Sequence, residues 1–576
     1  MKAEVEIKTE RVDDIPLLMW QQKAMGIPGI IDEVIAAHGN RQGLSIGWTV
    51  AGWITYILSE SDHRLSYVEP WAEAHVETLT KLIPMPVQVQ DFTDDRLGDV
   101  LRYLSDDEKW DAIECKVGQH LVHVYELPTQ RVRLDSTSVV VYHNAEDDSL
   151  FAHGHSKDHR PDLAQFKAML SALDPMALPI GIQVIRGNEA DDGLYIPAIE
   201  QSRKVLKRKG LLYIGDTKME ALATRAHLAA GDDFYLIPLS RKGTQGELLE
   251  ELLGMVEQRP SLLSAVRTPV SADGESRLVA QAYETLRPQE AVVNDEQLVW
   301  QERLLVVHSP TLAEQAEQGL TQRLQQAQEK LNALTARPGR GKKQWTAVEP
   351  LEAAVTKILQ HHRVTDLLQI TYQLQETTRH IRRHLDRPAR TEVTQLYTLT
   401  VTHHEGALAQ LRRTFGWRLF VTNCSQEALP LSEAILTYRQ APVAERDFSR
   451  LKGVPLGLRP VYLHREDHLI GLVRLLSLAL RVLTLVEFLV RQQLHDTQAS
   501  LTGLYPGNPT LPTQRPTTER LLRAFHNLTL TFIRTDGQSM IHLSPLSALQ
   551  SRILALIGFP DSIYTDLTRS PEPIPI

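Results

Sequence analysis

Cysteine is scarce in this sequence, which contains only Cys115 and Cys424. Two thiols cannot form a disulfide framework or a multi-cysteine zinc site, and they favour a reducing setting. Aromatic residues make up only 6%, and positive charge is not in excess, since 62 Lys and Arg stand against 71 Asp and Glu. The net charge of −9 argues against a polycationic nucleic-acid-binding protein, and 42% hydrophobic residues argue against disorder.

Uninterrupted hydrophobic runs are also missing. The first 20 residues carry charges throughout, so we expect no secretory signal. The most apolar stretch, 469–494, contains Arg474, Arg481 and Glu487. Each Arg at a bilayer centre would cost about 2.5 to 3.5 kcal/mol. We therefore expect a buried core helix with a narrow polar stripe, no membrane partner, and a cytoplasmic protein.

The hydrophobic periodicity changes at about residue 131. Residues 1–127 read as helical, whereas 131–142 reads as a strand and 166–185 as two strands that turn at Asp174-Pro175. A helix, a short buried strand, a second helix and another strand follow up to residue 239. Three antiparallel strands followed by βα units are the order of an α/β (mixed), ribonuclease-H-like sheet.

The rhythm breaks after residue 240 and resumes at the apolar segment 417–423. Between them lie a possible strand at 277–286, a long polar helix at 311–334 and a turn rich in Gly, Pro and Lys. We therefore predict a helical N-terminal accessory or DNA-binding domain, an α/β domain in two parts, a large insertion domain between the parts, and a linker with a helical C-terminus. Their ranges are 1–127, 128–240 with 416–495, 241–415 and 496–576.

Three carboxylates stand where this sheet would bring them together. Asp135 interrupts an otherwise apolar and basic strand, and Asp216 directly follows a buried strand. A helix from Pro442 places Glu445 in its first turn and Lys452 nearly on the same face two turns later. Converging carboxylates bind Mg²⁺ with water left in its octahedral shell, as two-metal phosphoryl transfer requires.

The order of these residues resembles a family. Asp135, Asp216, Tyr438, Glu445 and Lys452 follow the pattern of DDE-type insertion-sequence transposases with a Y-x2-R-x3-E-x6-K signature, with both seven-residue spacings intact. The strings LDSTSVVVY, GHSKDHRPDLAQFKAML, IGDTKMEA and ERDFSRLKG also look like this group's blocks, so the resemblance covers about 130–490. There is one departure, because the signature Arg is replaced by Ala441, with Arg439 and Arg446 nearby.

The resemblance implies a ribonuclease-H-like catalytic domain in which Asp135, Asp216 and Glu445 hold two Mg²⁺ ions, for which Mn²⁺ can substitute. Lys452 would contact a DNA phosphate and Tyr438 the DNA near the scissile bond, with Arg439 and Arg446 as further DNA contacts. The implied partners are the terminal inverted repeats of the protein's own element and target DNA, bound by a homodimer on paired ends. A cytoplasmic, nucleoid-associated location follows from that role.

Histidine and basic clusters remain open to other readings. We expect His153, His155 and His159 to be solvated or phosphate-contacting residues rather than metal ligands. In HREDH (464–468) a zincin motif would need Glu where Arg465 stands. The acidic net charge is an objection to DNA binding, which the basic runs at 202–210, 336–343 and 379–390 partly answer.

Two alternative functions remain. One is a catalytically decayed protein that binds DNA ends and keeps the transposase fold, which Ala441 and the acidic balance both allow. The other is a helical scaffold without a nucleic-acid role, which separated carboxylates would favour.

Overall fold

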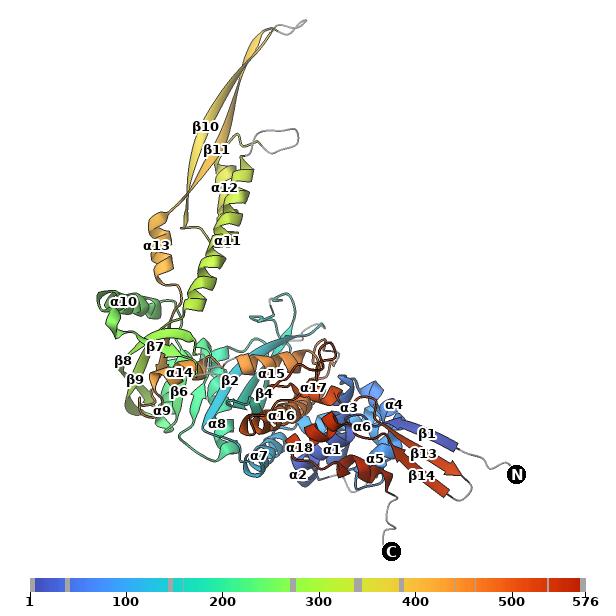
Figure 1. The fold of residues 1–576 in the computed structure, drawn as a ribbon. Helices are drawn as coiled ribbons and strands as arrows, with labels where there is room; N and C mark the ends of the chain where they lie inside the picture. Colours follow the sequence, from blue (N-terminus) through green and yellow to red (C-terminus); the bar gives the residue numbers. More distant parts are fainter. Residues whose placement is uncertain are drawn as a thin grey trace.

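The computed structural model describes residues 6–36, 42–142, 149–158, 160–269, 276–335, 344–382, 388–440, 442–461, 463–535 and 538–569. A slender arm rises from one side of a larger body, and the strands nearest the two chain ends lie together on the other side (Figure 1).

A nine-stranded mixed sheet runs through the body in the order β4-β3-β2-β5-β6-β12-β9-β8-β7. β2 (Arg131–Val140) is parallel to β5 (Leu212–Ile214), which is parallel to β6 (Phe234–Pro238). All other neighbours are antiparallel, and the remaining strands are β3 (Gln165–Leu173), β4 (Leu178–Arg186), β7 (Ser264–Arg267), β8 (Leu278–Val293), β9 (Glu296–His308) and β12 (Trp417–Thr422). The mixed α/β class is confirmed, as is the β3–β4 turn at Asp174-Pro175.

The sheet continues into the range that the sequence predicted as an insertion. β8 and β9 form a hairpin whose two connecting residues, Asn294 and Asp295, have φ angles of 50° and 65°. Positive φ at both positions is the geometry of a type I′ turn, which matches the twist of the paired strands. The inserted segment proper therefore begins after β9, not at residue 241. The sequence pattern of β8 predicted a strand, but it did not indicate which strand β8 would pair with.

The arm is the segment between β9 and β12. It has its own hydrophobic core, which includes Leu320, Leu324, Leu331, Leu351 and Val355. Its two ends meet at the paired residues His308 and Trp417 of neighbouring strands. The predicted polar helix is confirmed as α11, and the arm's elements are α11 (Pro310–Leu334), α12 (Val348–His362), β10 (Leu368–Ile381), β11 (Arg390–His403) and α13 (Glu405–Arg413).

The long apolar helix α16 (Glu466–Asp496) lies in the centre of the body. Its length and composition would suffice to cross a membrane, but 94% of its most apolar window is buried inside the protein. Its polar residues are partnered there: Arg481 donates to Glu114 at 2.7 Å and to the Pro179 carbonyl at 2.9 Å. α16 is therefore a core helix, as its polar stripe predicted.

The two chain ends build one lobe, which corrects two predictions. β1 (Glu6–Arg11), β13 (Thr529–Thr535) and β14 (Gln538–Leu543) form an antiparallel sheet, so the N-terminal domain is not purely helical and 496–576 is not only a linker with helices. Pairing over more than 500 residues leaves no local signal. The helices of these two ranges are α1 (Ile15–Ala24), α2 (Ile27–Val34), α3 (Ile46–Glu60), α4 (Val68–Ala74), α5 (Val76–Leu82), α6 (Asp94–Ser105), α7 (Asp107–Val124), α17 (Thr518–Arg523), α18 (Ala548–Ile557) and α19 (Ser562–Thr565).

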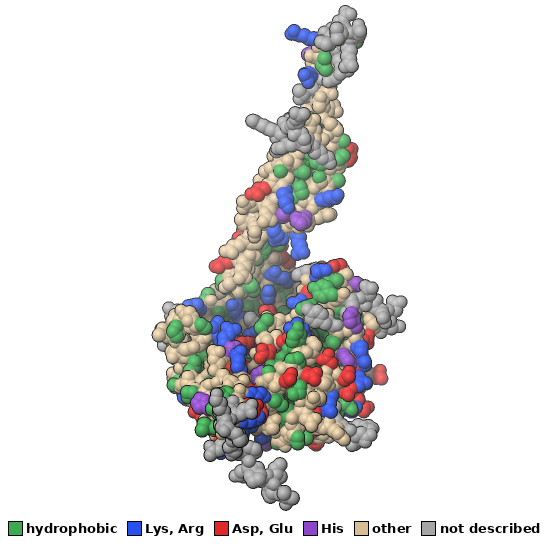
Figure 2. Space-filling model, turned by 90° about the vertical axis from the view of Figure 1, so that its right-hand side faces the viewer, with side chains coloured by type: hydrophobic (Ala, Val, Ile, Leu, Met, Phe, Trp, Pro, Cys, Tyr) green, Lys and Arg blue, Asp and Glu red, His purple; other side chains and the backbone are tan. Residues whose placement is uncertain are grey.

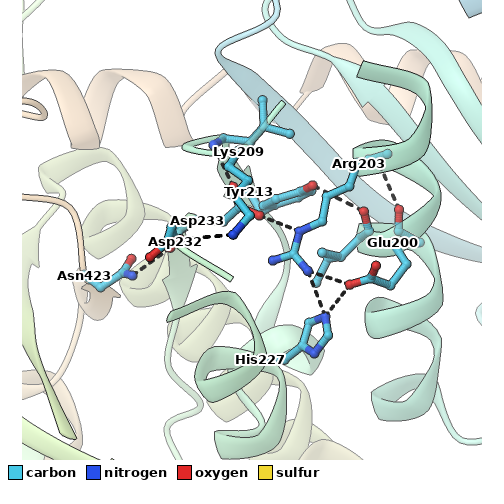
Figure 3. A network of polar contacts seen from close by, with 12 residues as sticks. Glu200, Arg203, Lys209, Tyr213, His227, Asp232, Asp233 and Asn423 are labelled. Atoms are coloured by element: carbon cyan, nitrogen blue, oxygen red, sulfur yellow. Dashed lines mark hydrogen bonds and ion pairs between the residues drawn. The ribbon is translucent and has the colours of Figure 1, made fainter. Parts of the chain in front are cut away.

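A polar network fixes the helices that flank β5 and β6 (Figure 3). Arg203 of α8 (Tyr195–Leu206) pairs with Asp233 at 2.7 Å and with Glu200 at 2.5 Å. Glu200 also lies 2.7 Å from His227 of α9 (Leu222–Ala230), and Asn423, just beyond β12, donates to the Asp233 carbonyl. Asp233 precedes β6, whereas Asp216 follows the parallel strand β5. This network therefore lies at the opposite end of these strands from Asp216.

Candidate active site

Three acidic side chains line one small pocket on the central sheet. Asp135 lies in the middle of β2, and Asp216 follows β5. Because the parallel register pairs Arg133 with Ile214, the two aspartates stand level on neighbouring strands. Glu445 comes from the first turn of α15 (Pro442–Lys452), which packs against β2. The pocket has a volume of about 120 Å³, and its lining is Arg133, Leu134, Asp135, Ile214, Gly215, Asp216, Tyr438 and Glu445.

The carboxylates of this pocket interact electrostatically. Burial, together with the negative charges of Asp216 and Glu445, raises the pKa of Asp135 to about 6. The Lys157 ammonium opposes them from 3.8 Å. The pocket thus holds more negative charge than its own cations neutralise, which favours a bound cation.

Asp216 is held by a tyrosine that the sequence did not reveal. The hydroxyl of Tyr195, a fully buried residue at the start of α8, donates to Asp216 Oδ1 at 2.5 Å, and the Lys218 amide donates to the same oxygen at 2.9 Å. Burial and the Asp216 charge raise the pKa of Tyr195, so it stays a donor. Nothing in the local sequence distinguishes Tyr195 from a core tyrosine.

Tyr438 both lines the pocket and packs in the core. It ends α14 (Leu431–Tyr438), and its ring meets that of Phe420 edge-on, with centroids 4.7 Å apart. Burial raises the pKa of its hydroxyl to about 12, against the nearby Arg418 charge. The packing fixes the ring at the mouth of the pocket, next to Glu445.

Lys452 lies outside the pocket lining and is held by the loop between β2 and β3. Its Nζ is 3.3 Å from Asp158 Oδ1, and Arg459 binds Asp158 Oδ2 at 2.8 Å. Burial lowers the pKa of Lys452, and the Asp158 charge counteracts this effect. One carboxylate thus gathers two cations beside the pocket, and Asp158 belongs to the GHSKDHRPD block.

The structure does not bring Arg439 and Arg446 to the pocket. Arg439 donates to the Val279 carbonyl at 3.3 Å, towards β8, and Arg446 pairs with Glu487 of α16 at 2.6 Å. Their DNA contacts remain predictions, which must involve surfaces other than this pocket. Ala441 lies outside the described residues.

The donor set suits Mg²⁺ by chemical type, because it consists of carboxylate oxygens. Within the described part of the chain, no group of three or more His, Cys, Asp and Glu side chains is arranged to hold one ion. Mg²⁺ usually takes one or two carboxylates and keeps several waters, so three carboxylates around two ions do not require such a group. The hydrogen bonds described for Asp135 and Asp216 involve Oδ1 of each residue. None of these bonds occupies Oδ2, the oxygen that each residue can offer to a metal ion.

The described residues of the histidine and basic clusters do not line the pocket. His153 and His155 belong to the loop between β2 and β3, His159 lies outside the described residues, and so does the basic run 336–343. The run 379–390 spans the far end of the β10–β11 hairpin, of which 383–387 are not described. The run 202–210 covers the end of α8 and the residues that follow it, and its Arg203 belongs to the network of Figure 3.

Comparisons with known proteins add little. No family model and no curated protein matches the chain. Among solved structures, the chain is similar to a cryo-EM structure of a piggyBac transposase synaptic complex with hairpin DNA, at a TM-score of 0.32 and 7% identity, over 90% of this chain and 81% of that one. A TM-score this low does not establish a shared fold, so a function must rest on the geometry of the site.

Proposed function

We propose that this protein is a DDE transposase that cleaves the ends of its own element and joins them to target DNA in a metal-dependent phosphoryl transfer. The observation that carries the proposal is the convergence of Asp135, Asp216 and Glu445, from two strands and a helix far apart in sequence, on one pocket. Tyr438 at the same pocket supports it further. A helical scaffold would allow the three carboxylates to lie far apart, but here they line one pocket.

The sheet supports a ribonuclease-H-like catalytic core. In the order β4-β3-β2-β5-β6, three antiparallel strands stand beside two parallel ones, which agrees with the predicted three antiparallel strands followed by βα units. The first aspartate on the central strand and the second after its parallel neighbour stand at adjacent positions of that sheet.

The chain's own residues have distinct parts in the reaction. Asp135, Glu445 and Asp216, which Tyr195 orients, would together hold the two Mg²⁺ ions. When bound, the metal ions supply an activated water or DNA 3′-hydroxyl and stabilise the leaving oxygen. Lys157 neutralises part of the charge of Asp135, and Lys452 with Arg459 offers cations to a DNA phosphate beside the pocket.

The charge distribution answers the objection from the acidic net charge. Residues 310–413, which make up the arm, contain 15 Lys and Arg against 10 Asp and Glu, so the rest of the chain carries the acidic excess. Figure 2 shows Lys, Arg and His side chains on the lower arm and around its junction with the body. We infer that terminal repeats and target DNA bind in the angle between arm and body, on a homodimer with paired ends, in a cytoplasmic, nucleoid-associated protein.

The test is strand cleavage of a duplex that carries the element's own ends, with Mg²⁺ or Mn²⁺. Asp135→Asn, Asp216→Asn and Glu445→Gln should each abolish cleavage and leave DNA binding intact. As a matched control, Asp366→Asn changes an exposed acid of the arm and should cleave like the wild type. Binding without cleavage under either metal would instead favour the decayed, DNA-end-binding protein, and absence of binding would refute both.

A further inference from the structure

A second pocket, larger than the catalytic one, is also lined by a residue of α15. Its volume is about 820 Å³, and its charged lining consists of Arg446, Arg491, Arg515 and His495 with a single acid, Glu487. Arg446 directly follows Glu445, and successive helical residues point about 100° apart. Neighbouring residues of α15 thus line the two pockets, and we call the second one the arginine pocket.

The charges of the arginine pocket are not balanced. Glu487 Oε1 pairs with Arg446 at 2.6 Å and Arg491 at 2.7 Å, and its Oε2 pairs with Arg450 at 2.5 Å. One carboxylate therefore faces three guanidinium groups, and Glu519 binds only Arg450.

No other acid among the lining residues restores the balance, since Glu487 is the single carboxylate there and Asp447 does not line the pocket. Arg446, which lines the pocket, has an Nε without a hydrogen-bond partner within the described residues. An unpartnered donor and excess positive charge are what an anion with several oxygens satisfies.

We propose that the arginine pocket binds a phosphate group of a DNA backbone that runs over α15 from the catalytic pocket. This inference rests on the proposed function, and it adds a site that fixes where the scissile bond lies.

The neutral part of the lining agrees with a nucleotide. Pro175, Met176 and Phe488 give one side of the pocket an apolar wall, whereas Gln492 and Gln514 offer amide groups. A free inorganic anion would use only the cations, but a sugar-phosphate unit would also cover the apolar wall.

The experiment compares full-length variants in binding to a 40-base-pair duplex by fluorescence anisotropy over a range of salt, and in binding inorganic phosphate by calorimetry. Arg515→Gln changes an exposed residue and leaves the ion pairs of Glu487 intact, so it tests the site without threatening the fold. Arg491→Gln is the second variant. Arg552→Gln, an exposed arginine of α18, is the matched control.

Each pocket variant should bind the duplex about 3- to 10-fold more weakly and lower the slope of log K against log salt by about one, while Arg552→Gln resembles the wild type. Glu487→Gln should bind more tightly, because it removes the competing carboxylate; a purely structural cluster would give no such gain. Unchanged duplex affinity in Arg515→Gln and Arg491→Gln overturns the inference. A loss of phosphate binding alone assigns the pocket to small anions and overturns it as well.

The two proposals fail in different ways. Neither arginine lines the catalytic pocket, so duplex binding by these variants tests the arginine pocket, whereas cleavage by the wild type tests the catalytic proposal. Wild-type binding and cleavage with unaffected variants would refute only the arginine pocket. Wild-type binding without cleavage would refute only the catalytic proposal, and no wild-type binding would refute both.

Discussion

Replacing Asp135 by Asn should stabilise the metal-free protein at neutral pH while it abolishes cleavage. The pKa of Asp135 is about 6 in the folded protein, mainly through burial, against an ordinary value of 3.8. A carboxyl group with the higher pKa in the folded state destabilises the fold once both states are ionised, at 1.36 kcal/mol per pH unit. This gives about 3 kcal/mol, which we reduce to about 1 to 2 kcal/mol because the side chain is 30% exposed and solvent screens its charge.

The sign of the effect fixes its pH window. The destabilisation is nearly absent below about pH 4, where both states are protonated, grows up to about pH 6, and stays constant above it. At about 2.1 cal/mol/K per residue, a unit of roughly 300 residues should gain about 2 to 3 °C in Tm. The measurement is thermal unfolding in EDTA at pH 7.5 and 4.5, with Asp366→Asn as the exposed control.

Two further readings sharpen this test. At pH 4.5 the gain should fall to about a third, and Mg²⁺ should stabilise the wild type but not Asp135→Asn, because a ligand stabilises only the state that binds it. A variant no more stable than the wild type at pH 7.5, or a gain that does not change with pH, would refute the electrostatic account of the pocket.

Tyr195→Phe should raise the Mg²⁺ concentration for half-maximal cleavage by about tenfold, because Asp216 loses the hydroxyl that orients it. The Mg²⁺ affinity measured by calorimetry should fall by the same factor, and an unchanged affinity would make Tyr195 a packing residue only. Arg481→Met should lower the free energy of unfolding in urea by about 3 to 5 kcal/mol, because Glu114 is left buried and unpaired. The double variant with Glu114→Gln should recover much of the lost stability, and a loss under about 1 kcal/mol in Arg481→Met would contradict the prediction. Lys452→Gln should weaken duplex binding and lower the salt slope by about one, without moving the Mg²⁺ requirement; an unchanged slope would show that Lys452 stays with Asp158 when DNA binds.

Local sequence patterns were sufficient to predict strands β2 to β6 of the central sheet. The strand at 131–142, the turn at Asp174-Pro175 and the helix that begins at Pro442 all appear in the structure, because period, turn residues and helix starts are written in neighbouring residues. The convergence of Asp135, Asp216 and Glu445 was also predictable, since strand order and one helix position were enough to place them at one pocket.

What the sequence did not reveal depends on distant partners. β1 pairs with β13, and β8 and β9 join the central sheet through β12; a strand pattern does not say which strand it will meet. Tyr195 was missed for the same reason, as was the ion pair that turns Arg446 away from the catalytic pocket. In each case a residue gains its role only from a neighbour brought in by the fold.

The arm's attachment has an evolutionary consequence. Because it leaves and re-enters between two strands that are already paired at His308 and Trp417, and because it buries its own apolar core, a short turn in its place would leave the register of β9 and β12 unchanged. The arm can therefore become longer or shorter, or be exchanged, during evolution without a change in the positions of the three acidic residues. The pocket residues and the arm can diverge at different rates along one chain.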